Sequence, residues 1–290
     1  MKKRSFIFII LAGILWGTSG IFVKFLAPYG FSSLQMTFFR GLISFIAMLV
    51  YILCHDRKLL KVSLRELILF AGSGLGFFGT ASCYYFSMQA TSVSTAVVLM
   101  YTAPVLVMIF SVAFLGEKLT PLKTLSVLCM LLGCGLVSGI IGGLKFDFFG
   151  IAVGLLSGIS YSAYNLFTKI GMRRGSHPLT ATLYCFIFSS AIAFFTCSPK
   201  EIPDAVSADA SVTIPLIIAL GICTCVLPYL LYTIALKALP AGTASALSIV
   251  EPMAATVFSI VLFEEDIGIS SVCGIILILG AVFLLSRSEN

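Results

Sequence analysis

Charged residues are scarce in this chain: they make up 10% of its 290 residues, whereas 59% are hydrophobic. Soluble domains carry about a quarter charged residues, so the composition excludes a soluble fold of this length. Histidine occurs only at His55 and His177, and the pair Cys223-Thr-Cys225 lacks both a nearby histidine and a second cysteine pair. We therefore expect no metal and no cofactor, and we interpret the nine cysteines as small apolar packing residues.

Apolar stretches long enough to cross a bilayer recur along the whole chain. About 20 apolar residues in a helix span the hydrocarbon core, and this rule predicts ten spans. They cover residues 5–26, 34–54, 65–88, 92–115, 121–141, 148–170, 179–198, 212–236, 241–263 and 269–286. The first follows a basic start as a signal peptide does, but it is long enough to span and lacks a cleavage site, so we expect it to be retained. The predicted fold class is an all-α membrane protein.

Basic residues are distributed unevenly between alternate loops, which predicts the orientation. The side that carries the N-terminus holds Lys2, Lys3, Arg4, Arg57, Lys58, Lys61, Arg65, Lys118, Lys123, Lys169, Arg173, Arg174, Lys237 and Arg287. The opposite loops hold only two bases and most of the acids: Lys145, Lys200, Asp147, Glu201, Asp204, Asp209, Glu264, Glu265 and Asp266. We expect the protein to lie in the cytoplasmic membrane with both termini in the cytoplasm. The net charge of +6 does not indicate nucleic acid, because the bases lie in short loops.

Two parts of the sequence match two later parts at nearly the same offset, which indicates an internal repeat. The stretch ending at Lys24 aligns with that ending at Lys169, an offset of 169 − 24 = 145. The stretch around Pro104 aligns with that around Pro252, an offset of 252 − 104 = 148. Five spans per repeat is an odd number, so residues 146–290 would enter the membrane inverted relative to residues 1–145. Inverted repeats are typical of secondary transporters, with the substrate site near the midplane between them.

Short motifs in both halves of the chain point to a known family. They are Trp16-Gly17 with Lys24, Arg40, Pro104 with Leu115-Gly-Glu-Lys-Leu-Thr-Pro121, and Glu251-Pro252. On these the chain resembles the EamA-type members of the drug/metabolite transporter superfamily over nearly its whole length. The resemblance implies ten helices and a central cavity walled mainly by helices 1, 3, 4, 6, 8 and 9, with helices 5 and 10 outside. It also implies transport of amino acids and other small metabolites, often outward. The second half departs from the pattern, with Phe263-Glu-Glu-Asp266 where the first has Leu-Gly-Glu-Lys.

Glu251 is the acidic residue that the sequence places deep within a predicted span. Intramembrane acids usually face a cavity or a partner rather than lipid, so we expect a binding role. The alternative is that Glu251 caps backbone loosened by Pro252, or pairs with a buried base. The candidate substrate-binding residues are Trp16, Ser19, Tyr84, Tyr101, Tyr161, Asn165, Tyr232, Ser248 and Glu251.

Each of these candidates also has a structural interpretation. Asn165 would equally serve as a hydrogen-bonding contact between helices. Tyrosines near span ends would belong to the membrane interface. Tyr84 and Tyr232 occupy equivalent positions (232 − 84 = 148), so we expect them to face each other across the pseudo-twofold axis. Trp16 lies in mid-span, which favours a cavity wall over an interface.

Three prolines lie inside predicted spans, at Pro104, Pro228 and Pro252. Each frees a backbone carbonyl and bends its helix, which predicts either hinges or static kinks. Arg40 and Lys24 lie near span ends and would extend to the interface, or Arg40 would hold a gate. Glycine pairs such as Gly13-x-x-x-Gly17 predict close helix packing within a monomer, with a weak dimer as the alternative.

An enzymatic interpretation depends on Ser19, which lies in Gly17-Thr-Ser-Gly20 and is similar to the Gly-x-Ser-Gly of intramembrane rhomboid proteases. A serine nucleophile needs a base, usually histidine, to accept its proton. His55 and His177 fall in loops whereas Ser19 lies in mid-span, so we expect no enzyme.

The sequence thus predicts a secondary transporter for an amino acid or a similar zwitterion, working by alternating access and exporting its substrate. Its expected partners are that small molecule, the lipid bilayer and protons at Glu251. The alternative is a proton-coupled multidrug exporter of hydrophobic cations, in which Glu251 would exchange a proton for the drug.

Overall fold

The computed structural model describes residues 2–138, 147–197, 206, 209–263 and 268–288, and these residues form helices and short connections without strands. The helices are α1 (Lys2–Gly17), α2 (Ser19–Leu26), α3 (Ser33–His55), α4 (Leu64–Ala90), α5 (Val93–Met100), α6 (Ala103–Leu115), α7 (Pro121–Val137), α8 (Phe148–Arg173), α9 (Pro178–Thr196), α11 (Ala210–Gly221), α12 (Leu227–Leu236), α13 (Ala241–Leu247), α14 (Val250–Phe263) and α15 (Ile269–Ser288). The described residues also form two short 3-10 helices, η1 (Ala27–Tyr29) and η2 (Arg57–Leu60), and one π turn, η5 (Ile222–Val226).

Among the described residues, eight helical segments are long and apolar enough to cross a membrane, and α7 is a shorter apolar helix. The helix α8 has 26 residues, which is long enough to span, but it buries polar side chains such as Asn165 and Lys169. The prediction of an all-helical membrane protein is therefore confirmed. The count of ten spans and their inverted arrangement stay predictions.

Two spans are broken near their middle just before a proline, which explains the position of the break. Proline has no N–H, so the carbonyl four residues before it loses its helical partner. The break between α5 and α6 at Tyr101–Thr102 precedes Pro104, and the break between α13 and α14 at Ser248–Ile249 precedes Pro252. The two breaks are 248 − 101 = 147 residues apart, close to the offset of the sequence repeat.

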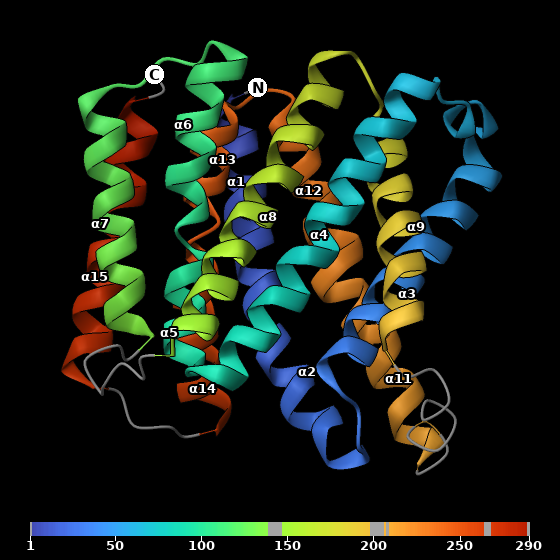
Figure 1. Ribbon diagram of the computed structural model, residues 1–290, viewed down its shortest axis with the longest axis horizontal. Helices are drawn as coiled ribbons and strands as arrows, with labels where there is room; N and C mark the ends of the chain where they lie inside the picture. Colours follow the sequence, from blue (N-terminus) through green and yellow to red (C-terminus); the bar gives the residue numbers. More distant parts are fainter. Residues whose placement is uncertain (1, 139–146, 198–205, 207–208, 264–267, 289–290) are drawn as a thin grey trace.

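The helices pack in pairs that join the two halves of the chain (Figure 1). Helix α4 packs against α8, α1 against α12, α3 against α9, and α7 against α15. Helices α5 and α6 both contact α8, and in the same way α13 and α14 both contact α1. Helix α4 contacts α9, and in the same way α11 contacts α3. These neighbour relations map onto each other when the first five predicted spans are exchanged, in order, with the last five.

Glycines allow the closest of these approaches. A Cβ at Gly274 of α15 would lie 2.6 Å from the Gly133 carbonyl oxygen of α7, and one at Gly133 would lie 2.9 Å from that of Gly274. A Cβ at Gly76 of α4 would lie 2.7 Å from the Tyr164 nitrogen of α8. Backbone therefore meets backbone at these crossings, as small residues permit in membrane helices.

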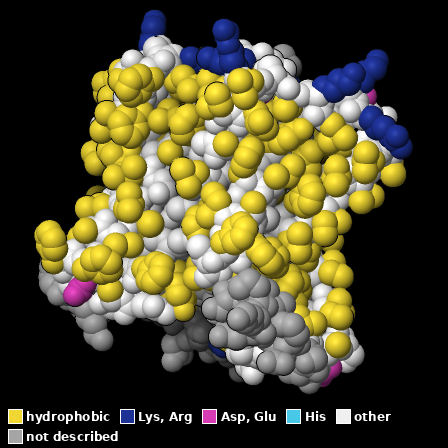
Figure 2. Space-filling view, turned by 45° about the vertical axis from the view of Figure 1, so that its right-hand side comes forward, with side chains coloured by type: hydrophobic (Ala, Val, Ile, Leu, Met, Phe, Trp, Pro, Cys, Tyr) yellow, Lys and Arg dark blue, Asp and Glu magenta, His cyan; other side chains and the backbone are white. Residues whose placement is uncertain are grey.

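Lys and Arg side chains project from one end of the molecule, above a broad hydrophobic belt (Figure 2). The chain's two ends lie at this same end (Figure 1), which we call the basic end. Exposed bases there include Arg4, Arg57, Lys58 and Arg174. The predicted placement of Lys145, Lys200, Glu201, Asp204, Glu264, Glu265 and Asp266 concerns residues outside the described ranges.

Candidate functional site

A cavity of about 590 Å³ lies among the helices. Residues of α1, α2, α3, α4, α5, α8, α11, α12 and α14 line it, together with the end of α7. Helix α4 contributes only residues from Phe77 onward, and α3 only Met36, Thr37 and Arg40 near its start. The cavity therefore runs from the middle of the bundle towards the end opposite the basic end.

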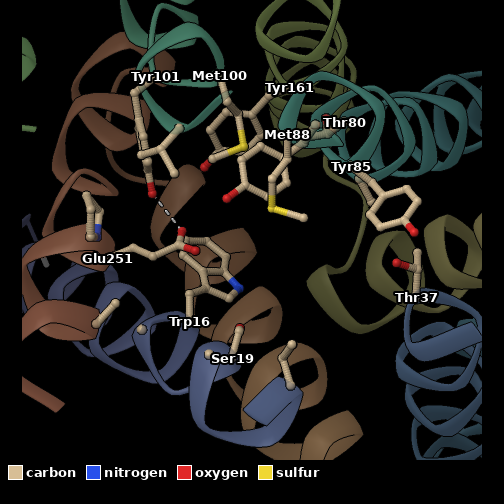
Figure 3. Close-up of a pocket in the computed structure, with 18 of the residues that line it drawn as sticks. Trp16, Ser19, Thr37, Thr80, Tyr85, Met88, Met100, Tyr101, Tyr161 and Glu251 are labelled. Carbon is tan, nitrogen blue, oxygen red and sulfur yellow. Dashed lines mark hydrogen bonds between the residues drawn. The ribbon is translucent and has the colours of Figure 1, made fainter. Parts of the chain in front are cut away.

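Glu251 lies in the wall of this cavity, in the first turn of α14. Its Oε2 accepts a hydrogen bond of 2.8 Å from the Tyr101 hydroxyl, which comes from the break between α5 and α6 (Figure 3). Oε1 has no hydrogen-bond partner among the described residues, and unlike the indole nitrogen of Trp16 it is not fully buried. The backbone breaks before Pro104 and Pro252 thus bring an acid and its donor together, and one carboxylate oxygen is left for a ligand.

Arg40 also lines the cavity rather than extending to the membrane interface. Its Nη2 donates to the Thr224 carbonyl oxygen at 3.3 Å. Thr224 lies within the π turn η5 and four residues before Pro228. Because proline has no N–H, the Thr224 carbonyl oxygen lacks its usual helical hydrogen-bond donor. Among the described residues Arg40 has no ion-pair partner, and its Nε is buried without a hydrogen bond.

Aromatic rings form much of the remaining wall. The Trp16 ring lies 4.9 Å from that of Tyr229 and 5.4 Å from that of Tyr232, measured between centroids. Tyr229 also contacts the Phe77 ring edge-on at 5.0 Å and the Tyr164 ring at 5.6 Å. The indole N–H of Trp16 is buried and has no partner among the described residues. A ligand in the cavity would meet rigid aromatic surfaces with few polar groups, as is usual for small-molecule sites.

Three of the predicted binding residues lie behind this wall. Asn165, Tyr232 and Ser248 are fully buried and do not line the cavity. The Tyr232 hydroxyl donates to Asn165 Oδ1, Asn165 Nδ2 donates to the Tyr161 carbonyl at 2.8 Å, and the Tyr161 hydroxyl donates to Ser248 at 3.1 Å. These hydrogen bonds hold Tyr161, which does reach the cavity. The expectation that Tyr84 and Tyr232 face each other stays a prediction, with Tyr84 on the cavity surface and Tyr232 behind it.

The remaining candidates lie on the cavity surface. Six of the nine predicted binding residues line it, namely Trp16, Ser19, Tyr84, Tyr101, Tyr161 and Glu251. Of the predicted hinge or gate residues, Pro252 and Arg40 line it, whereas Pro104 and Pro228 are buried. Sequence reasoning missed Tyr229, although it lies one turn before Tyr232, and it missed the wall residues Met36, Thr37, Thr80, Met88 and Met100.

At the basic end, contacts between the two halves close the bundle. Glu117, in the loop after α6, accepts from the Ala241 N–H at 2.9 Å, and Arg173 of α8 lies 3.8 Å from the same carboxylate oxygen. Arg173 also donates to the Leu115 carbonyl at 2.5 Å. We call Glu117, Arg173 and Ala241 the basic-end latch.

Lys169 adds to this closure in a way that the sequence did not predict. Lys169 is one of the bases that predict the orientation, but its side chain is buried, with 6% of its surface exposed. Its ammonium donates to the Leu236 carbonyl at 2.6 Å and to that of Leu239, at the end of α12. A cation at a helix C-terminus satisfies carbonyls that have no helical partner.

Comparison with known proteins shows to which family this architecture belongs. The model of the EamA-like transporter family matches residues 3–139 and 148–287. The chain belongs to the EamA-like transporter family. It is thus a multi-pass membrane protein of a transporter family, as its motifs predicted. Among its described residues, no three His, Cys, Asp or Glu side chains are grouped so that they could hold a metal ion.

Individual relatives of this EamA-like chain are distant. It is 26% identical to an uncharacterized transporter of Clostridium kluyveri over 99% of this chain and 95% of the relative. It is 29% identical to the threonine/homoserine exporter RhtA of Salmonella typhimurium over 72% of this chain and 68% of RhtA. A crystal structure of another protein, 19% identical, superposes with a TM-score of 0.82 over all of both chains, and supports the fold alone.

Proposed function

We propose that this chain is a secondary transporter that exports an amino acid or a similar zwitterion across the cytoplasmic membrane. The observation that carries the proposal is the cavity near the middle of the bundle, whose wall presents an unpartnered carboxylate oxygen of Glu251 among aromatic rings. A primary ammonium group would bind this oxygen, and an apolar side chain would pack on the rings. Similarity to a threonine/homoserine exporter supports an amino-acid substrate.

Alternating access would follow from two inverted five-helix repeats, residues 1–145 and 146–290. The exchangeable neighbour relations and the equivalent breaks before Pro104 and Pro252 support this arrangement. With the basic end in the cytoplasm, as the positive-inside rule requires, the closed latch and the cavity on the other side correspond to an outward-facing state. Rocking of one repeat against the other would then open the basic end.

A second candidate is the proton-coupled export of hydrophobic cations. The aromatic and methionine residues of the wall, together with Glu251, favour it because a cation would find both π faces and a carboxylate there. Arg40 in the same wall opposes it, because a permanent positive charge repels a cationic substrate.

The test is transport into proteoliposomes that contain the purified protein. We expect a panel of labelled L-amino acids to contain a substrate, and Glu251→Gln to abolish its uptake while Asp209→Asn, an acid outside the cavity, leaves it intact. Accumulation driven by a pH gradient in the wild type and lost in Glu251→Gln would support proton coupling.

Two results would contradict the proposal. Uptake of tetraphenylphosphonium in the absence of any amino-acid uptake would favour the multidrug alternative. Amino-acid uptake that is unchanged in Glu251→Gln would leave the transport function standing but remove Glu251 from the site.

A further inference from the structure

The guanidinium of Arg40 has hydrogen-bonding capacity that the protein does not use. Arginine presents five N–H donors in a planar fork, and Nη2 of Arg40 donates to the Thr224 carbonyl oxygen. Nε is buried without a hydrogen bond among the described residues, and the Cys225 side chain is a further neighbour of the guanidinium. The unused donors therefore belong to a side chain that lines the cavity.

An unpaired cation within a membrane bundle is costly, and such residues normally meet an anion or mark a substrate path. No described carboxylate pairs with Arg40 directly. Glu251 lies near enough for its charge to attract that of Arg40, but its hydrogen bond goes to Tyr101. The cavity thus holds one positive and one negative group that do not neutralise each other by contact.

We propose that Arg40 binds the carboxylate of the substrate, while Glu251 binds the ammonium group of the same molecule. This rests on the proposed function and narrows it, because the substrate must then carry both charges. A guanidinium matches a carboxylate with two parallel N–H···O bonds, which gives specificity as well as affinity. The class selected is an α-amino acid with an apolar side chain, since Phe77, Met88 and Met100 line the remaining wall.

The competing explanation is structural. Arg40 donates to the carbonyl that Pro228 releases, so it could serve only to brace the π turn against α3. A brace would be indifferent to the chemistry of the ligand, and its loss would weaken the binding of every ligand alike. A carboxylate receptor discriminates between ligands that keep and lack the carboxylate, and this difference decides between the two roles.

The chain offers a direct probe of the cavity, because Trp16 is its single tryptophan and lies in the cavity wall. Binding is measured in detergent from Trp16 fluorescence with three probes: L-leucine, L-leucinamide, which lacks the carboxylate, and 4-methylpentanoate, which lacks the ammonium group. The proteins are the wild type, Arg40→Gln, Arg40→Lys and Glu251→Gln.

We expect Arg40→Gln to weaken the binding of L-leucine about ten- to a hundred-fold, the effect of losing a charged hydrogen bond. The same variant should bind L-leucinamide at least as tightly as the wild type does, because L-leucinamide is a cation and gains from the loss of a positive charge. Arg40→Lys should recover part of the affinity, because it keeps the charge but not the fork. Glu251→Gln should show the converse pattern, weakening L-leucine and L-leucinamide but not 4-methylpentanoate. Retained L-leucinamide binding also shows that the Arg40→Gln protein is folded.

Two outcomes overturn the inference while leaving the proposed function intact. One is an unchanged affinity of Arg40→Gln for L-leucine, and the other is an equal loss for L-leucine and L-leucinamide, which would mark Arg40 as a brace. A wild type that binds none of the three probes would contradict the amino-acid assignment itself, and the inference with it.

Discussion

The basic-end latch predicts how much the Glu117 side chain contributes to the free energy of opening at the basic end. Glu117 accepts the Ala241 N–H at the start of α13 and faces Arg173 at 3.8 Å. Arg173 is 46% exposed, so that ion pair contributes about 0–1 kcal/mol. The hydrogen bond from the Ala241 N–H to a carboxylate contributes about 1.5–3 kcal/mol. Glu117→Ala removes both, and we expect it to lower the free energy of opening at this end by about 1.5–4 kcal/mol.

The assay is amide hydrogen exchange followed by mass spectrometry, which needs no substrate. Each 1.4 kcal/mol is a factor of ten in the opening equilibrium, so exchange in residues 241–247 should become about ten- to several-hundred-fold faster in Glu117→Ala. Glu117→Gln keeps an acceptor for the Ala241 N–H and should accelerate exchange by no more than about tenfold. Peptides of α7 serve as the internal control. Unchanged exchange in residues 241–247 of Glu117→Ala would refute the role of the latch.

Three further outcomes follow from other contacts. Gly274→Ala should lower the thermal unfolding midpoint, because the added Cβ would lie 2.6 Å from the Gly133 carbonyl oxygen. Gly280→Ala on the same helix is the control and should leave the midpoint unchanged, because the space around Gly280 is open. Equal midpoints of the two variants would refute the close packing of α7 and α15. Lys169→Gln should also lower the midpoint, by the loss of about 1.5–3 kcal/mol of charged hydrogen bonding, and an unchanged midpoint would contradict the role of Lys169 in closing α12. Trp16→Phe should keep the midpoint but weaken substrate uptake up to about tenfold, since the buried indole N–H has no partner among the described residues and a bound ligand would supply one; unchanged uptake would exclude that bond.

The positions of the spans and much of the cavity could be predicted from the sequence because both depend on simple regularities. Hydropathy marks the spans, and an acid such as Glu251 is too costly in lipid to face outward. The repeat located Pro104 and Pro252 as equivalent, and the backbone breaks before each of them in the structure. Side chains near these breaks, such as Tyr101, then line the cavity.

The direction in which individual side chains point could not be predicted as well from the sequence. The position of Arg40 near a span end suggested an interface residue, yet it shares a helix face with Met36 and Thr37 and points into the bundle. Tyr229 rather than Tyr232 lines the cavity, and both follow the π turn of η5. A π turn adds a residue and rotates everything after it about the helix axis, so equal sequence spacing does not give equal facing.

The proposed inverted repeat makes a last prediction about the state in which the basic end is open. Lys169 now closes the end of α12, and the equivalent Lys24 is exposed near the opposite end. If the two repeats exchange conformations, Lys24 should bind the carbonyls of the last turn of α4, the helix that corresponds to α11 and α12. Lys24→Gln should then slow transport, because the state with the open basic end loses this contact. Lys3→Gln, an exposed base at the basic end, is the matched control. Equal transport rates in Lys24→Gln and Lys3→Gln would show that the two repeats do not exchange this contact.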